Sequence, residues 1–277
     1  AQATNSKYYA KVIMKPTAKI EKGTIVVDGT VDELWSGVDA IPLTINLGAT
    51  VEAAAKLLWD EEYLYVLYEV KDSALNKANA NAWEQDSVEV FIDENNGKTG
   101  SLDADDKQYR INYENEQSFN GQKCIADNVK SAAKTTTDGY MVEAAFKWTD
   151  ITPEDGTQIG LELQINDASS AGKRVGTLSW FDQTGMGYAG SNVFGTVTLN
   201  ERDLKEMVDD LSVLVDENAT KEEKTQAVID IINEVKDLVA DKKTEELTAE
   251  FVKEIEDLFK ESIGRALNVV NKNNSVP

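Results

Sequence analysis

The stretch Asn81-Ala-Trp-Glu-Gln-Asp-Ser-Val-Glu-Val-Phe-Ile-Asp93 places a tryptophan directly before a strand pattern. From residue 87 to 93, valine and isoleucine alternate with polar or aromatic residues, which predicts a strand with one packed face and one free face that carries Glu89. Trp83 follows a run of small and polar residues that offers an indole little to pack on. An exposed indole beside polar groups suits a sugar ring, whose C–H bonds stack on aromatic faces. The alternative is a tryptophan at the rim of the core, because tryptophans are usually mostly buried.

The composition restricts the classes of partner. The chain has 277 residues, which is enough for two domains, and it has no apolar run near the length of a membrane span. Its net charge of -22 repels phosphate backbones and anionic lipid surfaces, so we expect neither nucleic acid nor membrane insertion. Neutral ligands and divalent cations remain as partners.

Histidine is absent and Cys124 is the single cysteine. The chain therefore lacks an internal disulfide, the usual neutral-pH base, the serine and cysteine triads, and the commonest zinc ligand. Its first residues show neither a charged segment nor an apolar segment of a signal peptide. We expect that a signal was removed or that the chain is part of a longer one.

Short alternating segments separated by turns dominate residues 18–199. One of them, 57–70, is a hairpin whose second strand is apolar on both faces, as expected of a central strand covered twice. The other expected strands are 24–30, 87–93, 108–114, 139–148, 158–166, 176–180 and 193–199, and residues 31–35 resemble one helical turn. This pattern predicts an all-β antiparallel sandwich of two sheets, preceded by a tail or linker at residues 1–17.

The composition changes after Leu199. Residues 200–277 contain no Trp or Tyr and show three amphipathic helical patterns, which predict an all-α three-helix bundle. Thr220 with Glu223 forms a capping-box signature for the second helix, and Thr244 is a candidate N-cap for the third. The apolar stripes favour a bundle core over a binding surface, because each helix must bury one side.

The same alternation places polar residues on the free faces of two further strands. Arg110 and Asn112 share one side of the segment 109–113, and Gln164 lies outward in the segment 161–165. If these strands share a sheet with Glu89, the four side chains converge on a patch that can bind neighbouring hydroxyls. The alternative is an ordinary surface ion pair between Glu89 and Arg110.

A sugar ring held from both sides needs a second aromatic residue. The loop 181–192 supplies Tyr188 among glycines, in surroundings too polar for a core residue. We expect this loop to fold over the patch.

A series of segments from about residue 18 to 199 resembles, in order, a family 9 carbohydrate-binding module of bacterial xylanases. Trp83-Glu-Gln-Asp-Ser-Val-Glu89 is the most specific of them. The full series is Thr24-Ile-Val-Val-Asp-Gly29, Asp32-Glu-Leu-Trp35, Leu58-Trp-Asp-Glu-Glu-Tyr-Leu-Tyr-Val66, Trp83-Glu-Gln-Asp-Ser-Val-Glu-Val-Phe-Ile-Asp-Glu-Asn-Asn96, Gln108-Tyr-Arg-Ile-Asn112, Tyr140-Met-Val-Glu-Ala-Ala145, Gln164-Ile-Asn-Asp167 and Ser179-Trp-Phe-Asp182.

The resemblance implies a jelly-roll-like sandwich, bound structural calcium, and a site that clamps reducing-end sugars of xylan or cellulose chains between two aromatic rings. Trp83 is implied as one ring. The implied hydrogen-bonding partners are Glu89, Arg110, Asn112, Gln164 and Asp167. The second ring is usually tryptophan, and here Tyr188 takes its place. The family has an amide-bearing residue just before this second ring, and here Met186, which cannot donate a hydrogen bond, aligns with it. We therefore expect weaker binding or an altered sugar preference.

The acidic loop 93–106 is the candidate calcium site. Calcium binds six to eight oxygen atoms from carboxylates, amides and carbonyls, and a glycine-bearing loop can wrap around it. The candidate ligands are Asp93, Asn96, Asp103, Asp105 and Asp106. The alternative is that these acidic side chains are solvated charge.

The leading hypothesis is a non-catalytic, secreted or cell-surface module that holds an attached glycoside hydrolase near plant polysaccharide. A second hypothesis is a glycoside hydrolase that uses Glu89 with Glu162 or Asp167. A third is a calcium-stabilised adhesion or scaffold protein whose helical bundle makes the protein contacts.

Overall fold

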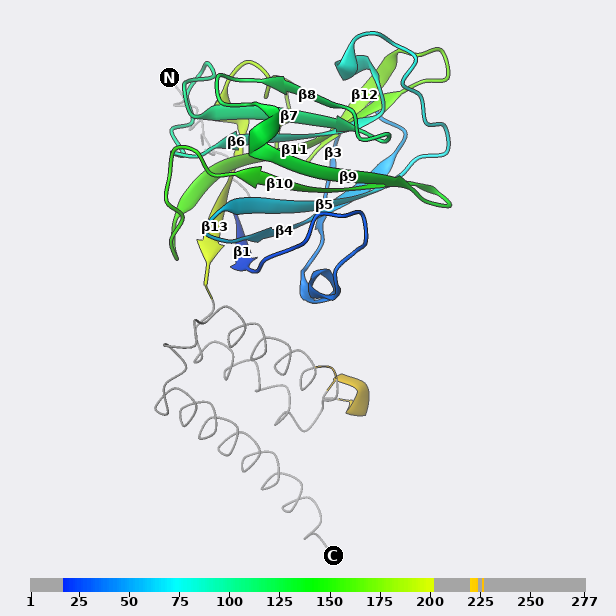
Figure 1. The fold of residues 1–277 in the computed structure, drawn as a ribbon. Coiled ribbons are helices and arrows are strands. Elements are labelled where there is room, and N and C mark those ends of the chain that lie inside the picture. The colour runs from blue at the N-terminus through cyan, green and yellow to red at the C-terminus, as the bar shows by residue number, and fades with distance from the viewer. Residues whose placement is uncertain (1–16, 202–219, 224–225, 227–277) are drawn as a thin grey trace, which may run out of the picture. The chain divides into compact units, whose positions relative to one another are not determined.

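The computed structural model describes residues 17–201, 220–223 and 226 (Figure 1). The chain divides into two units after Asn200. The tail predicted for residues 1–17, Thr17 apart, and nearly all of the three-helix bundle predicted for residues 200–277, Thr244 included, lie outside the described residues. No helix within the described ranges is long and apolar enough to cross a membrane.

The predicted capping box of the C-terminal unit is confirmed. The Thr220 backbone N–H donates to Glu223 Oε2 at 2.6 Å, and the Glu223 N–H donates to Thr220 Oγ1 at 3.2 Å. Residues 221–223 are helical directly after this cap. The reciprocal bonds satisfy two donors that a helix start otherwise leaves unpaired.

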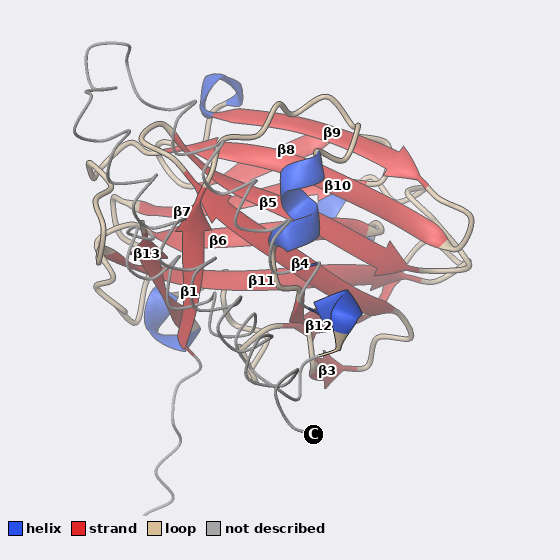
Figure 2. Cartoon of the chain, turned by 90° about the horizontal axis from the view of Figure 1, so that it is seen from below, coloured by secondary structure: helices blue, strands red, loops and turns tan. Residues whose placement is uncertain are grey.

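The N-terminal unit is a β-sandwich formed by one continuous, curled sheet (Figures 1 and 2). Its strands are β1 (Thr17–Lys22), β2 (Ile41–Pro42), β3 (Ile45–Leu47), β4 (Glu52–Trp59), β5 (Tyr63–Lys71), β6 (Ser87–Asp93), β7 (Asp106–Asn112), β8 (Gln117–Asn120), β9 (Val129–Thr135), β10 (Gly139–Lys147), β11 (Gln158–Ala168), β12 (Arg174–Ser179) and β13 (Gly195–Asn200). Four short 3₁₀ turns are η1 (Glu33–Gly37), η2 (Ala82–Glu84), η3 (Ala126–Asn128) and η4 (Ser191–Val193).

The strand order explains how one sheet makes two layers. It runs β8-β7-β6-β11-β13-β1-β4-β5-β10-β9, and β12 and β3 extend the sheet beside β11. Most pairs are antiparallel, as predicted, but β1 runs parallel to both of its neighbours, β13 and β4. Figure 2 shows β1 beside β13, where the sheet passes from one layer to the other.

The predicted alternation of β6 is confirmed on its packed side. Val88, Val90 and Ile92 belong to the main core between the layers. Across that core, the rings of Tyr109 and Phe146 lie 4.8 Å apart between centroids. Burial of such side chains supplies most of the favourable free energy of folding.

A second, smaller core lies on the outer face of β5 and β10, which confirms that β5 is covered on both faces. The strand predicted at residues 24–30 is wrong, because this segment crosses the face as irregular chain. It contributes Ile25, while Trp35 of η1, near the predicted helical turn, is 1% exposed. The Trp35 indole N–H donates to Glu143 Oε1 at 2.9 Å.

The outer face of β6 is also covered rather than solvated. Every residue of β6 is buried, Glu89 and Asp93 included. The Phe91 ring lies 5.7 Å from that of Phe194, which follows η4. The segments before β6 and after β12 therefore enclose this face and shape the candidate site.

Candidate functional site

A row of polar side chains crosses the covered face of the sheet. In the strand register, Arg110 of β7 and Gln164 of β11 lie on either side of Glu89 of β6, and Ser179 of β12 continues the row. Neighbouring side chains in register point to the same face of a sheet. The structure thus brings together three of the side chains predicted from their alternation.

Glu89 is the centre of this row and is only 1% exposed. Its Oε1 accepts hydrogen bonds from Arg110 Nε at 2.7 Å and from Asn166 Nδ2 at 2.5 Å, and its Oε2 accepts one from Gln108 Nε2 at 2.6 Å. Bonds to a charged acceptor are shorter and stronger than neutral ones. The carboxylate is therefore fixed in place, and its charge is balanced by the neighbouring guanidinium.

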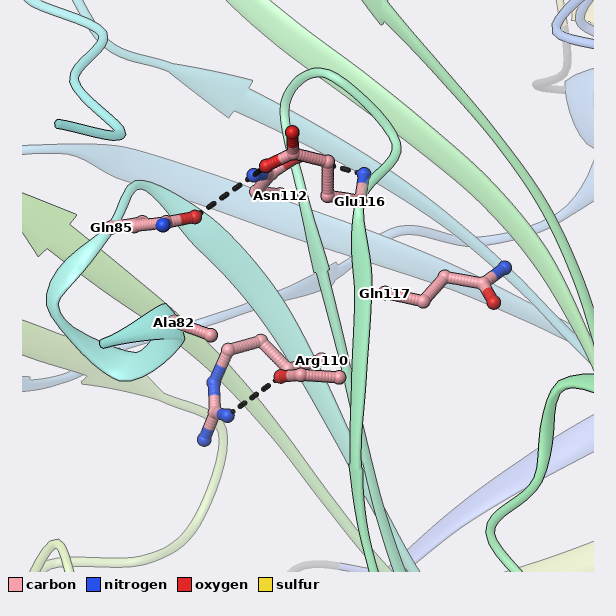
Figure 3. Close-up of a pocket in the computed structure, with 7 residues that line it drawn as sticks. Ala82, Gln85, Arg110, Asn112, Glu116 and Gln117 are labelled. Atoms are coloured by element: carbon pink, nitrogen blue, oxygen red, sulfur yellow. Dashed lines mark hydrogen bonds between the residues drawn. The ribbon is translucent and has the colours of Figure 1, made fainter. Parts of the chain in front are cut away.

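A pocket opens between η2 and the edge strand β8 (Figure 3). Its lining residues are Ala82, Gln85, Arg110, Asn112, Glu116, Gln117 and Ser118. Arg110 is one of these lining residues and donates through Nη1 to Ser118 Oγ at 3.0 Å. The pocket thus combines a balanced charge with amide and hydroxyl groups, a composition suited to a polar, uncharged ligand.

Asn112 lines the pocket, but its amide is used within the protein. Its Nδ2 donates to Gln85 Oε1 at 2.9 Å and to Glu116 Oε2 at 2.7 Å (Figure 3). Its Oδ1 accepts from the backbone N–H groups of Glu114 and Glu116. Asn112 therefore holds the turn between β7 and β8 against Gln85. Gln85 and Glu116 were missed as pocket residues, although Gln85 belongs to the specific segment that starts at Trp83.

Trp83 lies on η2 at the rim of this face and is 46% exposed, which argues against the rim-of-core alternative. The segment that carries it is tied down on both sides. Gln85 Nε2 donates to the Asn79 carbonyl at 2.7 Å, and Asn79 Nδ2 donates to the Gly172 carbonyl at 2.7 Å. The indole is thus presented to solvent on a fixed turn, which favours stacking on a ligand.

Tyr188 is the second exposed ring, at 55%. Its hydroxyl donates to Met186 Sδ at 3.5 Å, and Met186 is also exposed. The nearby Gly185 has a positive φ of 68°, and a side chain at this position would meet the Leu47 side chain at the end of β3. The Tyr188 hydroxyl is therefore bonded to a thioether, a weak acceptor, at the position where the resemblance implies an amide.

Glu162 holds the loop that carries Tyr188. Its carboxylate accepts from the backbone N–H groups of Trp180, Phe181 and Asp182 at 2.9 to 3.1 Å. Asp182 in turn accepts from Gly187 N at 2.8 Å. Burial raises the pKa of Glu162 to about 8, against the effect of the backbone N–H groups. Glu162 is fully buried and engaged with the loop, so its geometry does not support the role of a hydrolytic acid.

The structure does not place Asp167 in the polar row. Its Oδ2 accepts from the backbone N–H and the hydroxyl of Thr50, and its carboxylate lies within 4.8 Å of those of Asp72 and Asp86. The physical reason is the alternation of β11, which turns Asp167 away from the side of Gln164. Asp167 thus belongs to a cluster of three carboxylates and not to the polar row.

This three-carboxylate cluster fits a hard divalent cation. Burial and the neighbouring carboxylates Asp72 and Asp167 raise the pKa of Asp86 to about 7, although two backbone N–H groups oppose this. Burial also raises the pKa of Asp72. Two buried oxygens beside the cluster, Asp72 Oδ2 and the Tyr140 hydroxyl, have no hydrogen-bond partner. An oxygen-rich, negatively charged set of this kind is what calcium prefers.

In the predicted calcium loop, carboxylates accept hydrogen bonds from backbone N–H groups of the same loop. Asp93 accepts from Gly97 N and Lys98 N, Asp105 accepts from Asn95 N, and Asp106 accepts from Asp103 N. Burial raises the pKa values of Asp105 and Asp106 to about 6. The Oδ1 atoms of Asn96 and Asp106 are buried without a partner. Among the described residues, however, only Asp72, Asp86 and Asp167 bring three carboxylates within 4.8 Å of one another.

Comparisons with known proteins agree with this geometry. The family model described as "Carbohydrate family 9 binding domain-like" matches residues 27–202. The chain is 46% identical over 204 residues to the exoglucanase XynX of Acetivibrio thermocellus, covering 72% of this chain and 19% of that protein. It is 46% identical over 207 residues to endo-1,4-beta-xylanase A of Thermotoga maritima, with the same coverage of 72% and 19%. The chain thus spans about a fifth of the length of these curated relatives.

Solved structures give the same result. A carbohydrate-binding module of family 9 from Caldicellulosiruptor kristjanssonii, in complex with cellotriose, matches with a TM-score of 0.65 and 36% identity. The match covers 69% of this chain and 96% of that one. The same module in complex with glucose also matches with a TM-score of 0.65.

Proposed function

Because the chain belongs to the carbohydrate-binding family 9, we propose that its sandwich binds the reducing ends of cellulose-type and xylan-type chains without cleaving them. One observation carries this proposal: an exposed tryptophan, Trp83, stands beside buried polar groups that are already fixed by bonds to one another. Fixed polar groups bind a ligand with little loss of conformational freedom. The related module bound to cellotriose and glucose supports this ligand class.

The balanced charge of the Arg110–Glu89 pair supports a neutral sugar as the ligand. Arg110 and Glu89 neutralise each other at 2.7 Å, and Arg110 keeps N–H groups for a hydroxyl, because a guanidinium has five donors. Gln164, whose amide makes only a 3.4 Å bond to Asn166, can turn toward a ligand. Arg110 and Gln164 could thus bind two neighbouring hydroxyl groups of a sugar at the same time.

Recognition of a chain end is the finer part of the proposal. The pocket between η2 and β8 is lined on one side by residues 116–118 and on the other by Ala82 and Gln85. A reducing end presents an anomeric hydroxyl that a chain interior lacks, and a carboxylate such as Glu116 can accept its proton in a hydrogen bond. This favours a terminal sugar over an internal one.

The absence of cleavage is part of the same proposal. Glycoside hydrolysis needs two carboxyl groups, one of them an acid with access to the glycosidic oxygen. Glu89 is bonded to three side chains and Glu162 to three backbone N–H groups, and both are fully buried. Release of reducing sugar from xylan by the purified chain would contradict this part of the proposal.

Calcium is proposed as a structural cofactor at Asp72, Asp86 and Asp167. Both regions hold two buried oxygens without a partner, but among the described residues only the cluster brings three carboxylates within 4.8 Å of one another, which supports a cation there over the loop 93–106. When bound, the ion would supply positive charge to three carboxylates, of which Asp86 and Asp167 are buried and Asp72 is half-buried. Asp86 connects this cluster to the segment that carries Trp83, because its Oδ2 accepts from Asn76 N at 2.6 Å.

Targeting of a hydrolase completes the proposal. The chain matches about a fifth of much longer xylanases and an exoglucanase, so we place its sandwich beside a catalytic domain in a secreted enzyme. A binding module raises the local concentration of the attached enzyme at its substrate.

Titration calorimetry tests the binding proposal. The chain should bind cellobiose and xylobiose, and it should lose binding to the corresponding alditols, in which the reducing ring has been opened by reduction. Equal affinity for the sugar and its alditol would remove the reducing-end part of the proposal. No heat with either sugar would remove the function itself.

A further inference from the structure

We propose that Arg174 gives this site a preference for sugars that carry a carboxylate, such as uronic acids. The inference rests on the proposed sugar-binding function and specifies its ligand further. Arg174 is the first residue of β12 and is exposed. Its side chain was not among the site residues expected from the sequence.

Arg174 lies on the same face as the polar row. Its Nη1 donates to Asn166 Oδ1 at 2.8 Å, and Asn166 Nδ2 donates to Glu89 Oε1 at 2.5 Å. Its backbone N–H donates to Glu84 Oε2 at 2.8 Å, and Glu84 is the residue after Trp83. Arg174 is therefore one side chain away from Glu89 and directly beside the turn that presents the indole.

The two arginines of this face differ in their charge balance. Arg110 forms an ion pair with Glu89 at 2.7 Å. None of the ion pairs found in residues 17–201 includes Arg174. The nearby Glu84 carboxylate bonds the backbone of Arg174, and the guanidinium bonds a neutral amide oxygen. Arg174 thus presents a positive charge that no carboxylate on this face pairs with directly.

A guanidinium with one engaged Nη1 keeps other N–H groups for a ligand. These groups form a planar fork that matches a carboxylate, whereas a hydroxyl accepts through one oxygen only. The carboxylate of a uronic acid is exocyclic, so a ring stacked on Trp83 can direct it toward a neighbouring side chain. The net charge of -22 gives the whole chain no attraction for acidic sugars, so such a preference requires a local cation of this kind.

A purely structural role for Arg174 makes a different prediction. In that case, Arg174 would only hold Asn166, and through it Glu89. The loss of Arg174 would then lower the affinities for neutral and acidic sugars by the same factor. The ratio of the affinities for the acidic and the neutral sugar therefore shows whether Arg174 binds the carboxylate or only holds Asn166 in place.

The experiment is titration calorimetry of the full chain with glucuronic acid and with glucose at neutral pH and fixed ionic strength. We expect glucuronic acid to bind at least about tenfold more tightly, as one additional charge-assisted hydrogen bond would give. Arg174→Gln should bring the affinity ratio to about one while glucose binding stays within about twofold. Arg174→Lys, which keeps the charge but loses the fork, should retain part of the preference.

Lys173→Gln is the matched control, because it removes the same charge from the exposed neighbouring residue and should leave the ratio unchanged. Equal affinities of the unmodified chain for the two sugars would overturn the inference. An Arg174→Gln variant that loses affinity for glucuronic acid and for glucose by the same factor would also overturn it. These results leave the sugar-binding function intact. Failure of glucose itself to bind would instead overturn the proposed function together with this inference.

Discussion

Arg110 and Glu89 lie directly opposite each other on antiparallel strands, and their side chains meet at 2.7 Å between Nε and Oε1. The pair is largely buried, so its loss differs from the loss of a surface ion pair. Glu89→Gln should abolish sugar binding and reduce the free energy of unfolding by about 3 kcal/mol, because it leaves a guanidinium unbalanced. Calorimetry and denaturant unfolding measure the two effects.

Glu52→Gln is the control for this substitution. Glu52 pairs with Lys71 at 3.4 Å on the surface, with both side chains mostly exposed. Its replacement should change stability by less than about 0.5 kcal/mol and leave sugar binding intact. Similar effects of the two variants would mean that the Glu89 pair is only a surface contact.

Trp83→Ala should abolish detectable sugar binding and leave the melting temperature within about 2 °C, because the exposed indole contributes little to the core. Trp35→Ala is the matched comparison, since Trp35 is buried in the second core and bonded to Glu143. It should cost about 3–5 kcal/mol of stability. A large fall in melting temperature for the Trp83 variant would assign that ring to the core.

Tyr188→Trp should tighten sugar binding by about threefold to tenfold, because an indole offers a larger stacking surface than a phenol. Tyr188→Phe removes the hydroxyl that donates to Met186 and should change the affinity little. Titration of both variants with cellobiose measures this. Unchanged affinity in Tyr188→Ala would show that the ring takes no part in binding.

Removal of calcium with a chelator should lower the melting temperature, by the mass-action effect of a ligand that binds the native state. It should also weaken sugar binding, because Asp86 ties down the segment of Trp83 through Asn76. Asp86→Asn should abolish the response to calcium, whereas Asp105→Asn in the loop 93–106 should preserve it. The opposite pattern would move the ion to that loop.

The charge of the Asp150 carboxylate should stabilise the folded state in a way that depends on pH. Burial acts to raise its pKa, but hydrogen bonds from Lys123, Thr149 and Lys107 outweigh this and lower the pKa to about 2. A carboxyl with a depressed folded-state pKa stabilises the native state at neutral pH, and this contribution is lost as the pH falls from about 4 to about 2.

Asp150→Asn should therefore lower the melting temperature at pH 7, and the difference from the unmodified chain should disappear near pH 2. Thermal unfolding followed by circular dichroism across this pH range measures the convergence. A constant difference at every pH would show that the loss comes from packing rather than from charge. The exposed Asp138, replaced by asparagine, serves as the reference.

Alternation of side chains predicted the central strands well, because β5, β6 and β11 bury regular apolar residues. The edge strands were missed for a physical reason. β8 and β9 are short or polar and carry few large apolar side chains, so no periodic pattern marks them. The β-branched run at residues 24–30 misled in the opposite direction. Only part of it is buried, since Ile25 packs inward while Val26 is 68% exposed.

Strand alternation predicted the faces on which Glu89, Arg110 and Gln164 lie, and the pairing of their strands in one sheet brings them together. The carboxylate cluster was not predicted, because Asp72, Asp86 and Asp167 come from three segments that only tertiary folding brings together. Arg174 was missed for a related reason. Its position depends on a register shift in the pairing of β11 with β12, which sequence periodicity does not reveal.

The parallel pairing of β1 with β13 also determines how the sandwich would carry a mechanical load. Thr17 aligns with Thr196 and Glu21 with Asn200, so the chain enters this pair at one end and leaves it at the other. Tension between segments that precede residue 17 and follow residue 200 would load these aligned positions together in shear, instead of peeling them apart one by one. A unit connected in this way resists stretching along its strands.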